Sequence, residues 1–289
     1  MLGAALLAAV LLSGCSGPVS TGWLPSTPTT TNQTGRIISL WNGSWIAALF
    51  VGVIVWGLII WCVIAYRRRR EETSVPVQIR YNLPLEIMYT VIPLIMIAVL
   101  FFFTARDEAA IADTTAKPDV VINVVGKQWA WDFNYLQQNG QSLNVFEVGV
   151  QGQLNGTPAV EAELPTLYLP VGRRVQFELT SRDVIHSFWI PAFLYKMDVI
   201  PGVRNKFQVV PGRTGTFKGK CAELCGEYHS EMLFNVQVVS QADFDAHMQQ
   251  LRAAGHVGTL DSNLGRSYTP PGTGAVPGGT GYRNTTGSK

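Results

Sequence analysis

The sequence predicts a transmembrane helical hairpin followed by an all-β domain outside the membrane. Two long apolar runs occupy much of the first 106 residues, and from residue 119 onward apolar side chains alternate along short runs separated by Pro/Gly turns. The 289-residue chain is 47% hydrophobic and only 15% charged, which is too little charge for an ordinary soluble enzyme. Its net charge of +2 provides no bulk attraction for nucleic acid, so no nucleic-acid partner is expected.

The two apolar runs have the length that a bilayer requires. No charged residue occurs between 45 and 66, and at about 1.5 Å per residue this stretch forms a helix about 33 Å long. The second run contains Pro93, which a membrane helix tolerates where neighbouring groups satisfy the freed carbonyl. We therefore expect helices at about 45–66 and 86–105, within a hairpin over 41–106.

Basic residues between the two runs predict the orientation of the hairpin. Arg67 to Arg70 and Arg80 lie in the connecting loop, and basic residues in a short loop mark the cytoplasmic side. Both termini and the β domain should therefore lie outside the cytoplasm, in a multi-pass protein of a bacterial cell membrane.

The two ends of the chain carry different signals. Residues 1–15 predict a lipoprotein-type signal peptide, because Leu12 to Cys15 resembles a lipoprotein signal peptidase site and Cys15 would become the lipidated first residue. The positively charged start of such peptides is absent, which a misplaced start codon would explain. We expect an extracytoplasmic linker at 16–40 and a disordered Gly/Pro-rich tail at 255–289.

The β domain is expected between 117 and 254. Short alternating strands separated by Pro/Gly turns predict a β-sandwich or small barrel. One strand has an aromatic face, formed by Trp129, Trp131, Phe133 and Tyr135. Ser240 followed by Asp243 is a capping-box pattern that predicts a final helix, on which His247 should face solvent.

The residues most informative about function lie in one short segment. Cys221, Cys225, His229 and Met232 follow one another at spacings of four, four and three residues, so a turn can bring their side chains to one point. Thiolate and imidazole ligands select copper, zinc or iron–sulfur sites, and an added thioether favours copper. His186, on a separate strand, offers a further imidazole. Because a mononuclear blue-copper site needs only one cysteine, two thiolates indicate two copper ions bridged by sulfur, which suits electron transfer.

Three simpler interpretations of this segment remain open. Cys221 and Cys225 could form a disulfide, which the extracytoplasmic compartment permits. The cysteines and histidines could hold a structural zinc ion, although such a site does not need Met232. His229 and Met232 could also be ordinary strand residues.

The motifs together resemble a known family. The loop C-x-E-x-C-G-x-x-H-x-x-M, the hairpin and three segments are similar to subunit II of the haem–copper cytochrome c oxidases, over about 41–252. The three segments are D-V-I-H-S at 183–187, K-x-D-x-I-P-G at 196–202 and Q-W-x-W at 128–131. The resemblance implies a cupredoxin-like Greek-key barrel attached to a transmembrane α-helical hairpin, with a binuclear copper centre called CuA.

The resemblance also implies roles for individual residues of the loop. Cys221 and Cys225 would bridge two copper ions. His186 and His229 would be the terminal imidazole ligands. Met232 would be a weak axial ligand, and Glu223 would bind one copper through its backbone carbonyl. The Glu223 carboxylate would reach a magnesium ion at the interface with subunit I, and the alternative is a solvated loop carboxylate.

Two residues outside the loop match functional positions of the family. Trp129 matches the tryptophan through which electrons arrive from cytochrome c, although a Trp that alternates with other aromatic residues is usually in the core. Ala130 stands where the family usually has an aromatic residue, so a different docking surface is expected. Glu86 matches a carboxylate at the mouth of the proton pathway, and its alternative is a solvated acid at a helix N-terminus.

The implied function is that of the electron-accepting subunit of an aerobic respiratory terminal oxidase. The chain would accept electrons from a separate c-type cytochrome, because the C-x-x-C-H motif of a fused cytochrome is absent, and pass them to haem in subunit I. Oxygen reduction and proton pumping would belong to the complex with subunits I and III, and this chain would carry no haem. A membrane-bound donor, in a supercomplex with a cytochrome bc complex, is a further hypothesis. The alternative is a membrane-anchored cupredoxin or copper-delivery protein that acts without an oxidase.

Overall fold

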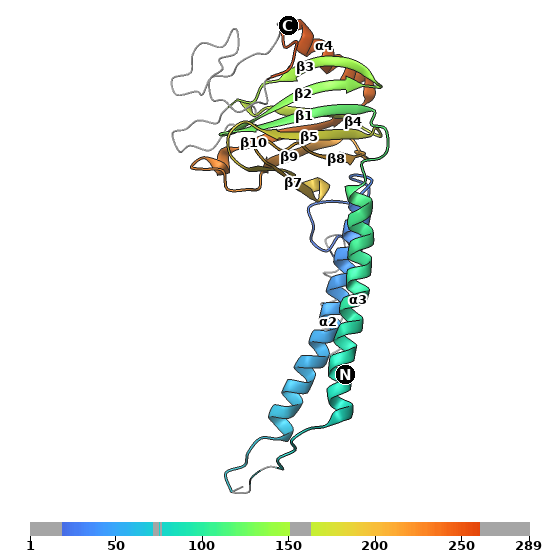
Figure 1. Ribbon diagram of the computed structural model, residues 1–289, viewed down its shortest axis with the longest axis vertical. Helices are drawn as coiled ribbons and strands as arrows, with labels where there is room; N and C mark the ends of the chain where they lie inside the picture. Colours follow the sequence, from blue (N-terminus) through green and yellow to red (C-terminus); the bar gives the residue numbers. More distant parts are fainter. Residues whose placement is uncertain (1–18, 72–74, 76, 151–162, 261–289) are drawn as a thin grey trace, which may run out of the picture. The chain divides into compact units, whose positions relative to one another are not determined.

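The computed structural model describes residues 19–71, 75, 77–150 and 163–260 (Figure 1). The described chain forms two units, which we call the hairpin (19–22 and 36–110) and the β-domain (23–35 and 111–260). The predicted signal peptide, including Cys15, lies outside the described residues.

The hairpin consists of helix α2, Thr34–Ala65, and helix α3, Leu83–Ala112. Both helices are long and apolar enough to span a membrane, which confirms the two predicted segments. Each is longer than its uncharged run. The Thr31 hydroxyl accepts hydrogen bonds from the backbone N–H groups of Gln33 and Thr34, so α2 begins before the apolar run. The linker that was expected to reach residue 40 therefore ends at Thr34.

Residues 23–35 pack on the β-domain as an extended strap rather than as a free linker. Thr31 forms an isolated β-bridge with Pro211, and Asn32 exchanges two hydrogen bonds with the backbone of Val210. The Ser26 hydroxyl donates to the carbonyl of Ala192 at 2.6 Å. The linker prediction was wrong for this segment, because its polar groups bond to Ala192 and Val210 of the β-domain.

Within the described residues, the β-domain contains ten strands in two five-stranded sheets (Figure 1). The first sheet has the order β3 (Gln141–Glu147), β2 (Ala130–Gln138), β1 (Val120–Lys127), β5 (Val175–Ser181) and β8 (Asn205–Val209). The second has the order β4 (Thr166–Pro170), β10 (Leu233–Val239), β9 (Gly215–Cys221), β6 (His186–Ile190) and β7 (Tyr195–Val199). Neighbouring strands are antiparallel except β1/β5 and β10/β4, which are parallel. The two sheets confirm the predicted β-sandwich.

An aromatic core lies between the sheets and follows the alternation read from β2. Trp131, Phe133 and Tyr135 are fully buried. Trp131 contacts Phe188 and Phe234 edge to face, with ring centroids 5.5 and 5.8 Å apart. Trp129, by contrast, lies in the turn before β2, so it does not continue this stripe as the alternation predicted.

The β-domain ends with helix α4, Gln241–Ala253. The Ser240 hydroxyl accepts a hydrogen bond from the backbone N–H of Asp243, as the capping pattern predicted. The apolar stripe of α4 is buried and consists of Phe244, Met248 and Leu251. Gly255, at a φ of +83°, ends the helix with a left-handed turn in which its N–H bonds to the carbonyl of Arg252.

The tail was expected to be disordered from residue 255, and this was wrong for residues 255–260. Leu260 is buried, and its backbone N–H and carbonyl both bond to the side chain of Asn134 at 2.7 and 3.0 Å. The backbone N–H of Phe146 donates to the carbonyl of His256. These hydrogen bonds extend the β-domain past α4, while 261–289 lie outside the described residues.

Candidate metal centre

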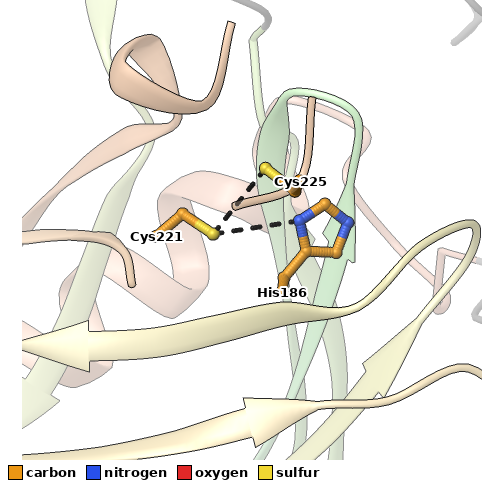
Figure 2. A group of neighbouring side chains, drawn as sticks. All are labelled: His186, Cys221 and Cys225. Carbon is orange, nitrogen blue, oxygen red and sulfur yellow. Dashed lines mark hydrogen bonds between the residues drawn. The ribbon is translucent and has the colours of Figure 1, made fainter. Parts of the chain in front are cut away.

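The predicted ligands come from two neighbouring strands and the loop that follows one of them. His186 is the first residue of β6, and Cys221 is the last residue of β9. These strands pair antiparallel, with Phe188 opposite Cys221, so the His186 side chain lies beside the start of the loop (Figure 2). The loop then places Cys225 before a short 3-10 helix, η3 (His229–Glu231), and Met232 directly after it.

Short contacts join all of these donor atoms into one cluster. The Cys221 sulfur lies 3.9 Å from His186 Nδ1 and 3.8 Å from the Cys225 sulfur (Figure 2). The Cys225 sulfur in turn lies 3.5 Å from His229 Nδ1 and 3.8 Å from the Met232 sulfur. His229 and Met232 are thus not merely strand residues.

The sulfur–sulfur distance decides between a disulfide and a metal site. A disulfide requires about 2.05 Å between the sulfurs, whereas Cys221 and Cys225 are both free thiols 3.8 Å apart. Metal–thiolate bonds of about 2.3 Å allow two sulfurs up to about 4.6 Å apart to share one ion. The disulfide interpretation therefore fails for this structure, and the donor set fits a soft metal.

The cluster is closed to water on most sides. His186 and Met232 are fully buried and both cysteines are nearly so, while His229 is half-buried. A carbonyl also faces the cluster, because Glu223 O lies 3.2 Å from the Cys221 sulfur. The two thiols affect each other's ionisation. A hydrogen bond from Cys225 lowers the pKa of Cys221 to about 3, whereas the hydrogen bond and charge of the Cys221 thiolate raise the pKa of Cys225. The pair thus offers a negative charge to a bound cation.

Asp183 holds His186 in the orientation that the site needs. Its carboxylate lies 2.8 Å from His186 Nε2, which leaves Nδ1 directed at the Cys221 sulfur. Burial alone would raise the pKa of Asp183, but hydrogen bonds from His186 and from the N–H groups of Gln128 and Val184 hold it below its usual value. The ionised carboxylate therefore accepts a hydrogen bond from Nε2–H, which keeps Nδ1 available as a ligand.

The change Asp183→Asn tests this positioning role. An amide does not select the Nε2–H tautomer as a carboxylate does, so we expect copper affinity to fall about 10–100-fold while the chain stays folded. Copper titration of the purified chain in competition with a chelator measures the affinity. The matched control is Asp198→Asn, on neighbouring strand β7, which should leave the affinity unchanged. Equal affinities for wild type and Asp183→Asn would contradict the role.

Comparisons with known proteins assign the family. The chain is 49% identical to a probable cytochrome c oxidase subunit 2 of Streptomyces avermitilis over 82% of this chain and 82% of that protein. The chain belongs to the cytochrome c oxidase subunit II family. It is also 38% identical to the cytochrome c oxidase subunit 2 of Mycobacterium tuberculosis, covering 86% of this chain and 80% of that protein. The family model for the subunit II periplasmic domain matches residues 120–239.

One solved structure is similar to about half of the chain. The periplasmic domain of subunit II of cytochrome oxidase (CoxB) from Bradyrhizobium japonicum is 29% identical, covers 49% of this chain and 99% of that chain, and has a TM-score of 0.41. By its own structure and its family, this subunit II chain consists of two apolar helices followed by a cupredoxin-like domain of two sheets.

Trp129 packs against the metal loop of this subunit II chain. The half-buried indole lies edge to face with Tyr228, with ring centroids 5.0 Å apart. A Cβ on Gly226 would lie only 3.0 Å from the indole, and Gln128 Nε2 donates to the carbonyl of Cys225 at 2.8 Å. Trp129 is therefore not an ordinary core residue, and its role in electron transfer stays a prediction.

The two acids assigned from the family lie far apart in the chain and have different surroundings. The Glu223 side chain is exposed in the metal loop, with its carbonyl turned toward Cys221. Glu86 accepts a hydrogen bond from the backbone N–H of Asn82, whose side chain accepts one from Leu85 N–H at the start of α3. Glu86 is thus a helix-capping acid, and its role in proton uptake stays a prediction, as does magnesium binding by Glu223.

His247 does not face solvent as the sequence predicted. Its ring stacks on Tyr168 with centroids 3.6 Å apart, and only 14% of the side chain is exposed. Glu147 lies 3.9 Å away, and burial raises the pKa of this glutamate to about 7. Burial also lowers the pKa of His247, so the His247 ring carries little charge beside Glu147 near neutral pH.

The raised pKa of Glu147 makes stability depend on pH. Between about pH 4.5 and 7 the folded state binds more protons at this site than the unfolded state does, so the free energy of unfolding falls as pH rises through that window. Glu147→Gln should remove this slope and stabilise the chain above pH 7. Thermal unfolding at pH 5 and pH 8 measures it, with Glu178→Gln on β5 as the control. A slope that persists in Glu147→Gln would contradict the assignment.

Proposed function

We propose that this chain is the electron-accepting subunit of an aerobic respiratory terminal oxidase. It takes electrons from a separate c-type cytochrome at a binuclear copper centre and passes them to haem in subunit I, where oxygen is reduced to water with proton pumping. The observation that carries the proposal is the convergence of two thiols, two imidazoles and a thioether in one largely buried cluster.

The number of donors supports two ions rather than one. Each sulfur has two further donors within 4 Å: His186 and the Glu223 carbonyl for Cys221, and His229 and Met232 for Cys225. A mononuclear copper site of the electron-transfer type uses about four ligands, of which only one is a thiolate. Two copper ions held by both thiols would account for all six donors.

Bound copper would supply a one-electron carrier. The chain holds the ligands in fixed positions, keeps water away from the sulfurs and places partly exposed groups next to the cluster. Strands β6 and β9 hold His186 and Cys221, and the Cys221 backbone N–H also bonds to the Met232 carbonyl, so the ligands stay in place when charge changes. Burial of the sulfurs excludes water. His229 and Trp129 are the partly exposed groups next to the cluster, which fits the arrival of electrons on that side.

The remaining parts of the proposal rest on the family resemblance, on the basic loop and, for Cys15, on the signal-peptidase-like motif. The Arg67–Arg70 loop is cytoplasmic and the β-domain lies outside. Glu223 holds magnesium at the interface with subunit I, Glu86 conducts protons, and Cys15 carries lipid. Subunit III completes the complex, and a donor within a cytochrome bc supercomplex fits the near-balanced charge of the chain.

Purification from membranes tests the proposal against a copper-delivery protein. We expect two copper ions per chain, haem iron in an accompanying subunit, and an electron paramagnetic resonance signal from one electron shared by two coppers. One copper per chain, or material without haem, would overturn the proposal. Zinc in place of copper would support the structural-zinc interpretation.

A further inference from the structure

The hairpin contains a groove that electron transfer does not use. It has a volume of about 540 Å³ and lies between α2 and α3, toward the ends away from the Arg67–Arg70 loop. The α2 side is formed largely by small residues and the α3 side by bulky apolar ones. They include Ser39, Gly43 and Ala47 on α2 and Met96, Val99 and Phe103 on α3.

A cluster of two arginines and one aspartate closes one end of this groove. Asp107 is 3% exposed, and a single oxygen of its carboxylate accepts from Arg36 Nη1 at 3.0 Å and from Arg106 Nε at 2.9 Å. The Arg106 guanidinium also lies over the Phe103 ring, 5.0 Å from its centroid. Two cations thus share one anion, which leaves a net positive charge at the end of an apolar groove.

The arginines remain accessible to a further anion. The side chains of Arg36 and Arg106 are 38% and 53% exposed. Each guanidinium has five N–H donors, and Asp107 uses only some of them. Because the shared carboxylate holds both guanidinium groups at one oxygen, their remaining donors lie close enough together to contact one phosphate.

We propose that this hairpin groove binds one anionic phospholipid. The phosphate lies on Arg36 and Arg106, and an acyl chain lies along the apolar walls of α2 and α3. Trp41 and Trp45, about one and a half and two and a half turns from Arg36 on α2, have the amphipathic rings that mark the headgroup level of a bilayer. A partner helix is the other conceivable occupant, but its apolar face would leave the extra positive charge without a counter-charge.

Two variants separate the groove from its arginines. Gly43→Leu fills the groove, and the structure tolerates it because a Cβ on Gly43 meets nothing within 4 Å. Arg106→Gln removes one guanidinium, while Arg36 still pairs with Asp107. The chain is solubilised from membranes with its accompanying subunits, delipidated and titrated with phosphatidylglycerol, and bound lipid is counted by native mass spectrometry. Each variant should bind about tenfold more weakly, as loss of a charged hydrogen bond or of the chain contact implies.

Matched controls make the result specific. Gly57→Leu adds the same side chain at another open position of α2, and Arg80→Gln removes an arginine that does not line the groove; both should bind phosphatidylglycerol as wild type does. Phosphatidylcholine should bind more weakly than phosphatidylglycerol. Equal binding of the two lipids, or unchanged lipid binding in Gly43→Leu, would overturn the proposal. If Gly43→Leu released the haem-containing subunit with the lipid count unchanged, the groove would be a protein contact and the proposal would also fail.

Discussion

Cys225→Ser should leave the chain folded but abolish the copper pair. The Cys225 sulfur is the centre of the cluster, because it contacts the Cys221 sulfur, His229 and Met232 within 3.8 Å. A hydroxyl is a harder and less acidic ligand than a thiol, so it cannot bridge two soft ions. We expect the shared-electron resonance signal to disappear and oxidation of cytochrome c to fall by more than about a hundredfold, beyond the loss typical of residues that only orient ligands.

Cys62→Ser is the matched control for this change. Cys62 is a free cysteine exposed on α2, in a membrane segment, and contacts none of the metal donors within the described part of the chain. Its substitution should leave copper content, spectrum and turnover unchanged. If Cys225→Ser kept two copper ions per chain and the shared-electron signal, sulfur bridging by this residue would be disproved.

Lys127→Met should strongly reduce the stability of the β-domain. Lys127 Nζ lies 2.7 Å from Asp132 Oδ1, and both side chains are almost completely buried. Burial lowers the pKa of Lys127 to about 8, so the lysine is still charged at neutral pH and balances the aspartate. Without it Asp132 becomes a buried unpaired charge, which costs about 3–5 kcal/mol in the free energy of unfolding. Denaturant unfolding of the purified chain, followed by near-ultraviolet circular dichroism, measures the loss.

A second variant distinguishes an uncompensated charge from lost packing. Lys127→Met with Asp132→Leu removes both charges, so it should recover part of the stability lost in the single variant. Full recovery is not expected, because both side chains also bond to the backbone of Gly149. Lys218→Met, at an exposed lysine that bonds to Asn235, is the control and should change stability by less than about 0.5 kcal/mol. A double variant less stable than Lys127→Met would contradict the charge argument.

The sequence by itself determined the elements whose signals are local. Two long apolar runs predicted α2 and α3, because a bilayer sets a minimum length for an apolar helix. The alternation of Trp131, Phe133 and Tyr135 predicted a strand with a buried face. The spacing of Cys221, Cys225, His229 and Met232 predicted a soft-metal loop, since donors so close in the chain converge in almost any tight turn.

Contacts between distant segments were decided only by the tertiary structure. Asp132 and Asn134 are polar and alternate with the aromatic residues of β2, yet they are buried, because Gly149 and Leu260 cover them through hydrogen bonds. The joining of Asn134 to Leu260 spans 126 residues, a separation at which no periodicity carries information. The same limit explains why the strap at 23–35 was read as a linker.

The metal centre shows both sides of this division. Its loop could be recognised from spacing alone, but the approach of His186 depends on β6 pairing with β9 in one particular register. The orientation of His186 depends further on Asp183, which accepts hydrogen bonds from Gln128 in the turn between β1 and β2 and from the adjacent Val184. Sequence patterns report which residues can bind a metal, whereas strand pairing and burial decide which of them meet, because those depend on the packing of the whole β-domain.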